Sequence, residues 1–103
     1  MTPDINAIVR RIVEAFEPER VVLFGSRARG DAREDSDVDL FVEMDSVESA
    51  PARAIRISAL FPGRRFPLDV MVYTPAEVAR LRGRAGTLLE LIEREGKVLH
   101  ERH

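Results

Sequence analysis

Two aspartates, Asp37 and Asp39, are separated by one valine and followed by an apolar run. In a β-strand, alternate side chains point to the same face, so both carboxylates would share a face with Cα atoms about 6.6 Å apart. Two such charges beside an apolar sheet raise the pKa of at least one carboxyl group unless a cation or hydrogen-bond donors compensate them. The spacing therefore predicts a divalent-cation site.

A third acid, Asp69, lies in the otherwise apolar segment 67–73 and would join the first two if the strands are neighbours. Oxygen ligands, with no cysteine in the chain and no histidine nearby, favour Mg²⁺ or Mn²⁺ over zinc. Three carboxylates can bind two metal ions about 3.5–4 Å apart. We therefore expect Asp37, Asp39 and Asp69 to be the catalytic residues and the metal ligands. In such a site one ion activates the oxygen atom that attacks a phosphate, and the other holds the phosphates. Asp69 would lie nearest the attacking hydroxyl group, as ligand or as base.

Gly25 and Ser26 follow the short apolar segment 21–24 and could open a helical turn. Backbone N–H groups and the Ser26 hydroxyl would then point at an anion, and glycine lets the backbone approach it closely. Arg27 and Arg29 could add charge-assisted contacts to phosphates, although a helical spacing of two sends them in different directions. We expect these four residues to bind a nucleotide, with one of the two arginines touching it.

The elements that must position these residues follow from apolar spacing and from turn residues. Apolar or alternating runs predict strands at residues 21–24, 37–43 and 67–73 and allow an edge strand at 97–100. Apolar stripes predict helices at 5–16, 49–60 and from 75 towards 96, the last interrupted by two glycines, with a short helical turn at 27–29. Helices and strands alternate, which indicates an α/β or α+β domain with a small central sheet.

Local patterns also orient some of the helices. In the helix at 49–60 the apolar residues are expected to face the core and the arginines to face water: Ala52, Ile55, Ala59 and Leu60 against Arg53 and Arg56. Thr2 is expected to cap the first helix, with Pro3 at its first position. A capping-box pattern starts the helix at 75.

Size and charge limit the function. The chain has 103 residues, of which 45% are hydrophobic and 33% charged, so we expect residues 1–103 to form a single domain. The net charge of −2 argues against a general nucleic-acid binder, and we expect no direct binding of nucleic acid. No apolar run approaches the roughly 20 residues that cross a bilayer, and no signal-peptide pattern is present. We therefore expect a cytoplasmic protein that does not bind the membrane.

Gly25-Ser26, Asp37-Val38-Asp39 and Asp69, in this order, resemble the minimal nucleotidyltransferases of the DNA polymerase β superfamily. The fuller strings at 23–30 and 36–40 look like those of antitoxins whose partners are toxins with the higher-eukaryote and prokaryote nucleotide-binding (HEPN) domain. The resemblance covers nearly the whole chain. It implies a small mixed sheet of three to four strands flanked by about four helices.

The resemblance also implies ATP as the nucleotide donor and Mg²⁺ as the cofactor. In this family Asp37 and Asp39 would bind metal, Asp69 would complete the site, and Ser26 would contact the triphosphate. Antitoxins of this type are similar to enzymes that transfer AMP to a tyrosine of a partner HEPN ribonuclease toxin. A chain of 103 residues has little surface to enclose an acceptor, so a protein that presents its own hydroxyl group fits as the substrate. We expect a protein adenylyltransferase that acts as an antitoxin, in a hetero-oligomer with its toxin.

Two other functions remain open. A binding module could neutralise its partner by masking a surface without catalysis, although such a module needs no cluster of mutually repelling acids. Nucleotide transfer to a small molecule such as an aminoglycoside would need an acceptor-binding domain. The chain has no room for one, so a partner subunit would have to supply it.

Overall fold

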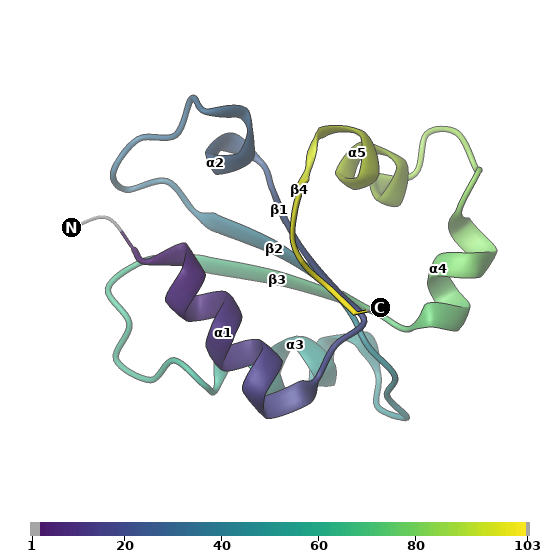
Figure 1. Ribbon diagram of the computed structural model, residues 1–103, viewed down its shortest axis with the longest axis horizontal. Helices are drawn as coiled ribbons and strands as arrows, with labels where there is room; N and C mark the ends of the chain where they lie inside the picture. Colours follow the sequence, from purple (N-terminus) through teal and green to yellow (C-terminus); the bar gives the residue numbers. More distant parts are fainter. Residues whose placement is uncertain (1–2, 103) are drawn as a thin grey trace.

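A four-stranded sheet forms the centre of the structure, a computed structural model that describes residues 3–102 (Figure 1). The strands are β1 (Arg20–Phe24), β2 (Val38–Glu43), β3 (Leu68–Tyr73) and β4 (Lys97–Glu101), in the order β3-β2-β1-β4. β2 is antiparallel to β1 and parallel to β3, and β4 is antiparallel to β1. The predicted α/β class with a small mixed sheet is confirmed, and β4 is the expected edge strand.

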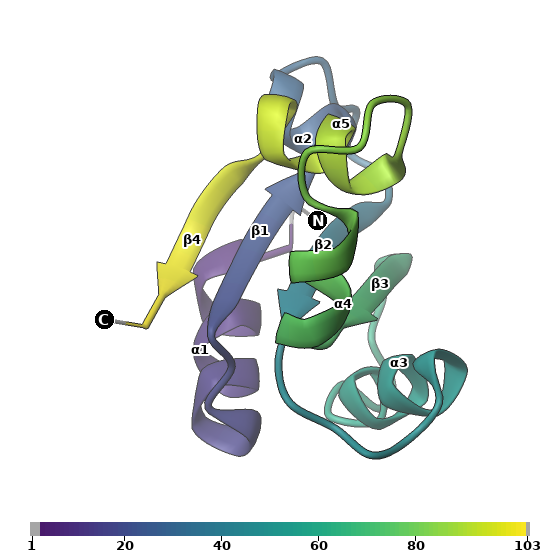
Figure 2. The same cartoon turned by 90° about the vertical axis from the view of Figure 1, so that its right-hand side faces the viewer.

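Five helices occur in the described residues: α1 (Ile5–Phe16), α2 (Ser26–Arg29), α3 (Ala50–Ser58), α4 (Pro75–Leu81) and α5 (Leu88–Glu95). α1 and α3 cover one face of the sheet, and α4 and α5 cover the other (Figures 1 and 2). The predicted break separates α4 from α5, and α4 begins with the predicted capping box. None of the helices in residues 3–102 has the length and apolar character to span a membrane.

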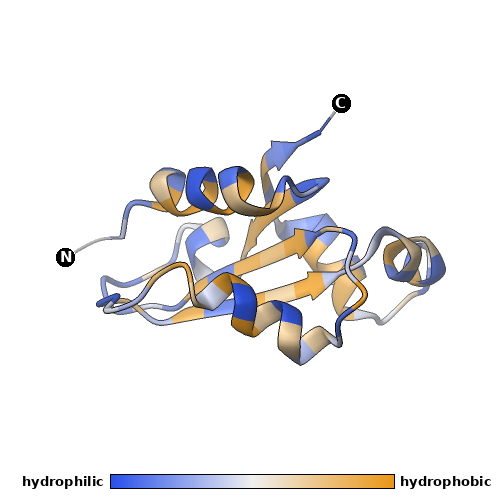
Figure 3. Ribbon diagram, turned by 90° about the horizontal axis from the view of Figure 1, so that it is seen from below, coloured by the Kyte–Doolittle hydropathy of each residue, from blue (hydrophilic) through white to orange (hydrophobic). Residues whose placement is uncertain are grey.

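Apolar side chains form one cluster on each face of the sheet. On the α1 and α3 face, Ile12 and Ile57 are fully buried against the strands. On the opposite face, Leu89 and Ile92 of α5 pack around Phe41 of β2. Figure 3 shows strands that are mostly hydrophobic between helices in which hydrophobic and hydrophilic segments alternate. Because the sheet is buried on both faces, its strands read in the sequence as nearly continuous apolar runs.

The start of α1 differs from the prediction. Asp4 is the N-cap, and its side chain accepts a hydrogen bond from the N–H of Ala7. Because α1 begins at Ile5, Pro3 precedes the cap and does not occupy the first helical position. The predicted Thr2 cap was therefore wrong, and Thr2 itself lies outside the described residues.

α3 buries a different face from the predicted one. Arg53 is buried and Ile57 fills the core, whereas Ile55 and Ala59 are exposed, so the predicted orientation was wrong for Arg53, Ile55 and Ala59. Leu60 packs against the core and Arg56 is exposed, as predicted. The Arg53 guanidinium donates hydrogen bonds to two backbone carbonyls and to a glutamate at the start of α4. These partners offset the cost of burying its charge. Apolar spacing along a helix carries no sign of such partners.

Candidate active site

β2 and β3 begin at the same end of the sheet (Figure 1). The three predicted acids lie at or just before the starts of these strands. Asp39 and Asp69 are direct partners in the parallel register of β2 and β3, as expected if the two strands are neighbours. Asp37 lies one residue before β2 and is exposed. The structure therefore brings Asp39 and Asp69 side by side and leaves Asp37 in the preceding loop.

The Gly-Ser turn is placed against one of these carboxylates. β1 ends at Phe24, which pairs with Asp39, so Gly25 and Ser26 follow directly beside that residue. Gly25 has a φ of +74°, and a Cβ atom there would be 2.2 Å from Oδ2 of Asp39. Its backbone angle and its contact both require glycine. α2 begins at Ser26, and the first N–H groups of a helix have no acceptor within it.

The two arginines of α2 have different surroundings. Arg27 turns back to the following loop, where its Nη2 donates to the carbonyl oxygens of Ser36 at 2.8 Å and of Glu34 at 3.3 Å. Its Nε is buried without a hydrogen-bond partner in the described part of the chain. The Arg29 side chain is half exposed and forms an ion pair with Asp31 at 3.4 Å. Arg29 is thus the better placed of the two to reach a phosphate.

The surroundings of the Asp39 carboxyl group disfavour its charged form. Its pKa is raised, first by burial and then by the charges of Asp69 and Asp37. Arg29 and Arg27 lower this pKa, but the net shift is upward. A positive charge near the carboxylates would relieve the repulsion. The site therefore favours a cation and is not neutralised by its own arginines.

Comparison with known proteins identifies the family of this chain. Residues 5–101 match the nucleotidyltransferase domain family. The chain belongs to this family. A solved structure of a candidate nucleotidyltransferase from Sulfolobus solfataricus is similar over 95% of this chain and 78% of that one, with a TM-score of 0.63 and 24% sequence identity. At that identity the similarity shows a shared fold. No curated protein matches the chain.

Nucleotidyltransferase domains generally use nucleoside triphosphates and divalent metal ions. Within residues 3–102, no three acidic or histidine side chains form a group that could hold an ion by themselves. This nucleotidyltransferase domain does offer the adjacent pair Asp39 and Asp69, and Mg²⁺ is commonly held by one or two carboxylates together with substrate phosphates. Oxygen donors and the raised pKa of Asp39 fit such an ion. The arrangement of two ions with Asp37 as a third ligand stays a prediction.

A cavity of about 490 Å³ lies between the loops that precede β2 and β3 of the nucleotidyltransferase domain. Arg33, Glu34 and Asp35 line it from one loop and Arg65 from the other. Pairing of the two strands brings these loops together, although they are far apart in the sequence. Sequence spacing therefore gives no signal for this cavity, which adds candidate substrate-contacting residues beside the acids.

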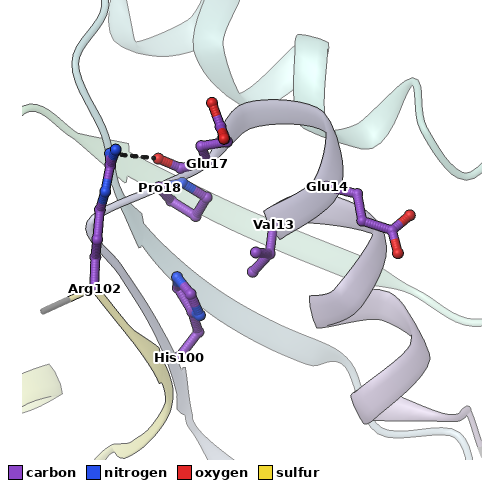
Figure 4. A pocket seen from close by; sticks show the side chains of 6 residues that line it. All are labelled: Val13, Glu14, Glu17, Pro18, His100 and Arg102. Atoms are coloured by element: carbon purple, nitrogen blue, oxygen red, sulfur yellow. Dashed lines mark hydrogen bonds between the residues drawn. The ribbon is translucent and has the colours of Figure 1, made fainter.

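A second hollow, of about 350 Å³, lies between the end of α1 and β4 (Figure 4). Its lining includes Val13, Pro18 and His100, and Arg102 donates a hydrogen bond to the Glu17 carbonyl at its rim. It is at the opposite end of β1 from the Gly-Ser turn and contains none of the predicted site residues. The predicted site residues therefore lie at the acid end of the sheet and not at this hollow.

Proposed function

We propose that this chain is a Mg²⁺-dependent adenylyltransferase that transfers AMP from ATP to a hydroxyl group of a partner protein. The observation that carries the proposal is the register of Asp39 with Asp69, beside the turn that begins at Gly25. Membership of the family supports nucleotidyl transfer as the class of reaction. ATP as the donor is supported by the resemblance of the Gly-Ser and Asp-x-Asp strings.

In the proposed reaction, the acceptor oxygen attacks the α-phosphorus of ATP in line. A new P–O bond forms to the acceptor, the bond to the bridging oxygen breaks, and pyrophosphate leaves with the electron pair. Ser26 and the first N–H groups of α2 hold the phosphates, and Arg29 pairs with the leaving pyrophosphate. The hydroxyl proton passes to Asp69. Asp39 and Asp69 would hold Mg²⁺, which when bound supplies positive charge at the phosphates.

The proposed acceptor is a tyrosine of a partner HEPN ribonuclease toxin, so that the chain acts as an antitoxin. The strings at 23–30 and 36–40 support this partner by resemblance. The structure is compatible with a large acceptor, because Asp69 is exposed and belongs to β3, an edge strand of the sheet. AMP attached near the active site of the toxin would add a bulky charged group and silence it.

The test combines the chain with labelled ATP, Mg²⁺ and the product of the neighbouring gene. We expect label on the partner and an equal amount of released pyrophosphate. Asp39→Asn and Asp69→Asn should each abolish the label, because each removes one carboxylate of the adjacent pair. Asp45→Asn, which alters an exposed aspartate beyond the other end of β2, should retain it.

The same experiment separates the competing functions. If Asp39→Asn still silences the partner and neither protein transfers label, the chain masks its partner without catalysis. Label that appears on a small molecule of a cell extract, and never on the partner, would indicate small-molecule transfer. Either result would overturn the proposed protein adenylylation.

A further inference from the structure

β4 is an edge strand whose outer side has no partner in residues 3–102. Its inner side pairs with β1, and Figure 2 shows it at the outer edge of the sheet, following directly from α5. Val98 is 53% exposed there. An edge strand presents a row of unpaired N–H and C=O groups that can pair with a strand from another chain.

The helix beside β4 also exposes apolar side chains. Leu88 and Leu91 of α5 are 40% and 39% exposed. Glu93 of the same helix accepts hydrogen bonds from Arg82, which follows α4, and from Arg20 of β1. At about 100° per residue, Leu88 and Leu91 fall on the opposite side of the helix from Glu93. α5 and the strand that follows it therefore both expose apolar side chains.

Val98 is the exposed apolar side chain of β4. It pairs with Val22 of β1, and Val22 lies in the cluster that α5 covers. Val98 thus faces the α5 side of the sheet. A partner that extended the sheet from β4 would pair with the backbone edge and lie beside Val98.

The charged residues of β4 would be complementary to those of a second, antiparallel copy of the strand. Lys97 and Glu101 are exposed at its two ends, and no ion pair joins either one to another residue in the described part of the chain. If two copies of β4 pair antiparallel about Leu99, Lys97 of each copy lies opposite Glu101 of the other. Opposite charges at directly facing strand positions are stabilising, and the two-fold symmetry provides two such pairs.

We propose that β4 pairs with β4 of a second copy of this chain, which makes a continuous eight-stranded sheet with a dimer axis at Leu99. The two α5 helices then lie on the same face of that sheet. The other edge strand, β3, is unsuitable because a chain paired there would crowd Asp69. Pairing through β4 keeps both acid sites on one face and at the far ends of the sheet, where a partner can reach them.

Light scattering during gel filtration of the full chain tests this proposal. We expect a mass of twice 11.6 kDa. Lys97→Glu and Glu101→Lys should each raise the dissociation constant about tenfold, because each places like charges opposite each other twice. The double variant Lys97→Glu with Glu101→Lys should restore the dimer, since the pairs are then reversed and not lost.

Matched controls separate this edge from the rest of the surface. Arg10→Glu makes the same change of charge on the exposed side of α1 and should leave the dimer unchanged. Val98→Ser should weaken the dimer, whereas Ile55→Ser, at an exposed isoleucine of α3, should not. Circular dichroism checks that each variant is folded.

Charged residues and bulges are also devices that keep edge strands unpaired, and β4 has an irregular register opposite Val21 and Val22. A wild-type chain that stays monomeric at all concentrations would show that Lys97 and Glu101 instead keep the edge of β4 unpaired. A dimer whose dissociation constant is unchanged by both single charge reversals would indicate that the interface is not at β4. Either result overturns the proposal.

Discussion

Gly25 and Asp39 meet at the end of the sheet so closely that a Cβ atom on Gly25 would lie 2.2 Å from Oδ2 and 3.1 Å from Cγ of Asp39. This contact joins the turn proposed to hold phosphates to the carboxylate proposed to hold metal. The Asp39 side chain occupies the space beside the turn. The separation of these two proposed sites is thus set by the pairing of β1 with β2.

Gly25→Ala should therefore damage both folding and function. The new methyl group clashes with the Asp39 carboxylate, and a φ of +74° is strained for alanine, so we expect a loss of about 1–3 kcal/mol in unfolding free energy. Nucleotide transfer should fall to background as Asp39 is displaced. Gly83→Ala is the matched control, because Gly83 has a φ of +85° but open space around its Cα atom. Urea unfolding and transfer assays on both variants decide, and equal losses of activity would contradict the role of the contact.

Asp39 should make stability depend on pH. Its folded-state pKa is raised above 3.8, chiefly by burial and then by Asp69 and Asp37, so the folded protein holds the Asp39 proton more tightly than the unfolded chain does. The stability that this proton contributes is fully present below 3.8 and is lost as the pH rises through the folded-state pKa. Without divalent ions, Asp39→Asn should therefore be more stable than the wild type at neutral pH.

Below pH 3.8 the advantage of Asp39→Asn should disappear, because Asp39 is then protonated in the wild type as well. Unfolding in urea across a pH series measures both limits. Asp45→Asn provides the control for removal of one exposed acid and should give a curve close to that of the wild type. A variant Asp39→Asn that is less stable at neutral pH would contradict the raised folded-state pKa of Asp39.

Arg27 and Arg29 should separate stability from substrate binding. Arg27→Ala removes two hydrogen bonds to carbonyls of the following loop, so we expect a loss of about 1–2 kcal/mol and faster amide exchange in residues 31–36. Arg29→Ala breaks only an exposed ion pair and should change stability by less than about 0.5 kcal/mol. Its expected effect is a higher KM for ATP. If Arg29→Ala instead lowered the unfolding free energy and left the KM for ATP unchanged, the role assigned to Arg29 would be wrong.

The sheet and its acids could be predicted because each depends on local pattern. Strands buried on both faces read as apolar runs, and Asp39 and Asp69 interrupt two of them with charge. The Gly-Ser turn after β1 has a recognisable residue type at a position where φ is positive. What the sequence does not contain is the distance of Asp39 from Gly25, because that depends on how β1 pairs with β2.

Features that depend on contacts between distant segments were missed or reversed. The cavity lined by Arg33 and Arg65 exists because β2 and β3 are parallel neighbours. The prediction for Arg53 and Ile55 of α3 was wrong because Arg53 has hydrogen-bond acceptors that lie after it in the chain, and it is buried in place of Ile55. Helical periodicity weighs side chains by hydrophobicity alone and cannot include such partners.

Arg53 provides the last prediction, because its burial implies a structural role. It donates to the Val72 carbonyl at 3.1 Å and to Oε1 of Glu77 at 2.7 Å, and so ties α3 to the end of β3 and the start of α4. Arg53→Ala leaves these acceptors without their donor, and we expect a loss of about 2–3 kcal/mol in unfolding free energy. Arg56→Ala removes an exposed arginine of the same helix and should cost less than about 1 kcal/mol.

The ionisation of Glu77 gives this prediction a second readout. Its pKa is lowered, mainly by the hydrogen bond from the Thr74 N–H and in part by Arg53, so Arg53→Ala should move it upward without restoring its ordinary value. Carboxyl chemical shifts followed by NMR over an acid titration measure this change. If Arg53→Ala were as stable as Arg56→Ala and left the Glu77 titration unchanged, the buried arginine would not be what joins α3 to α4.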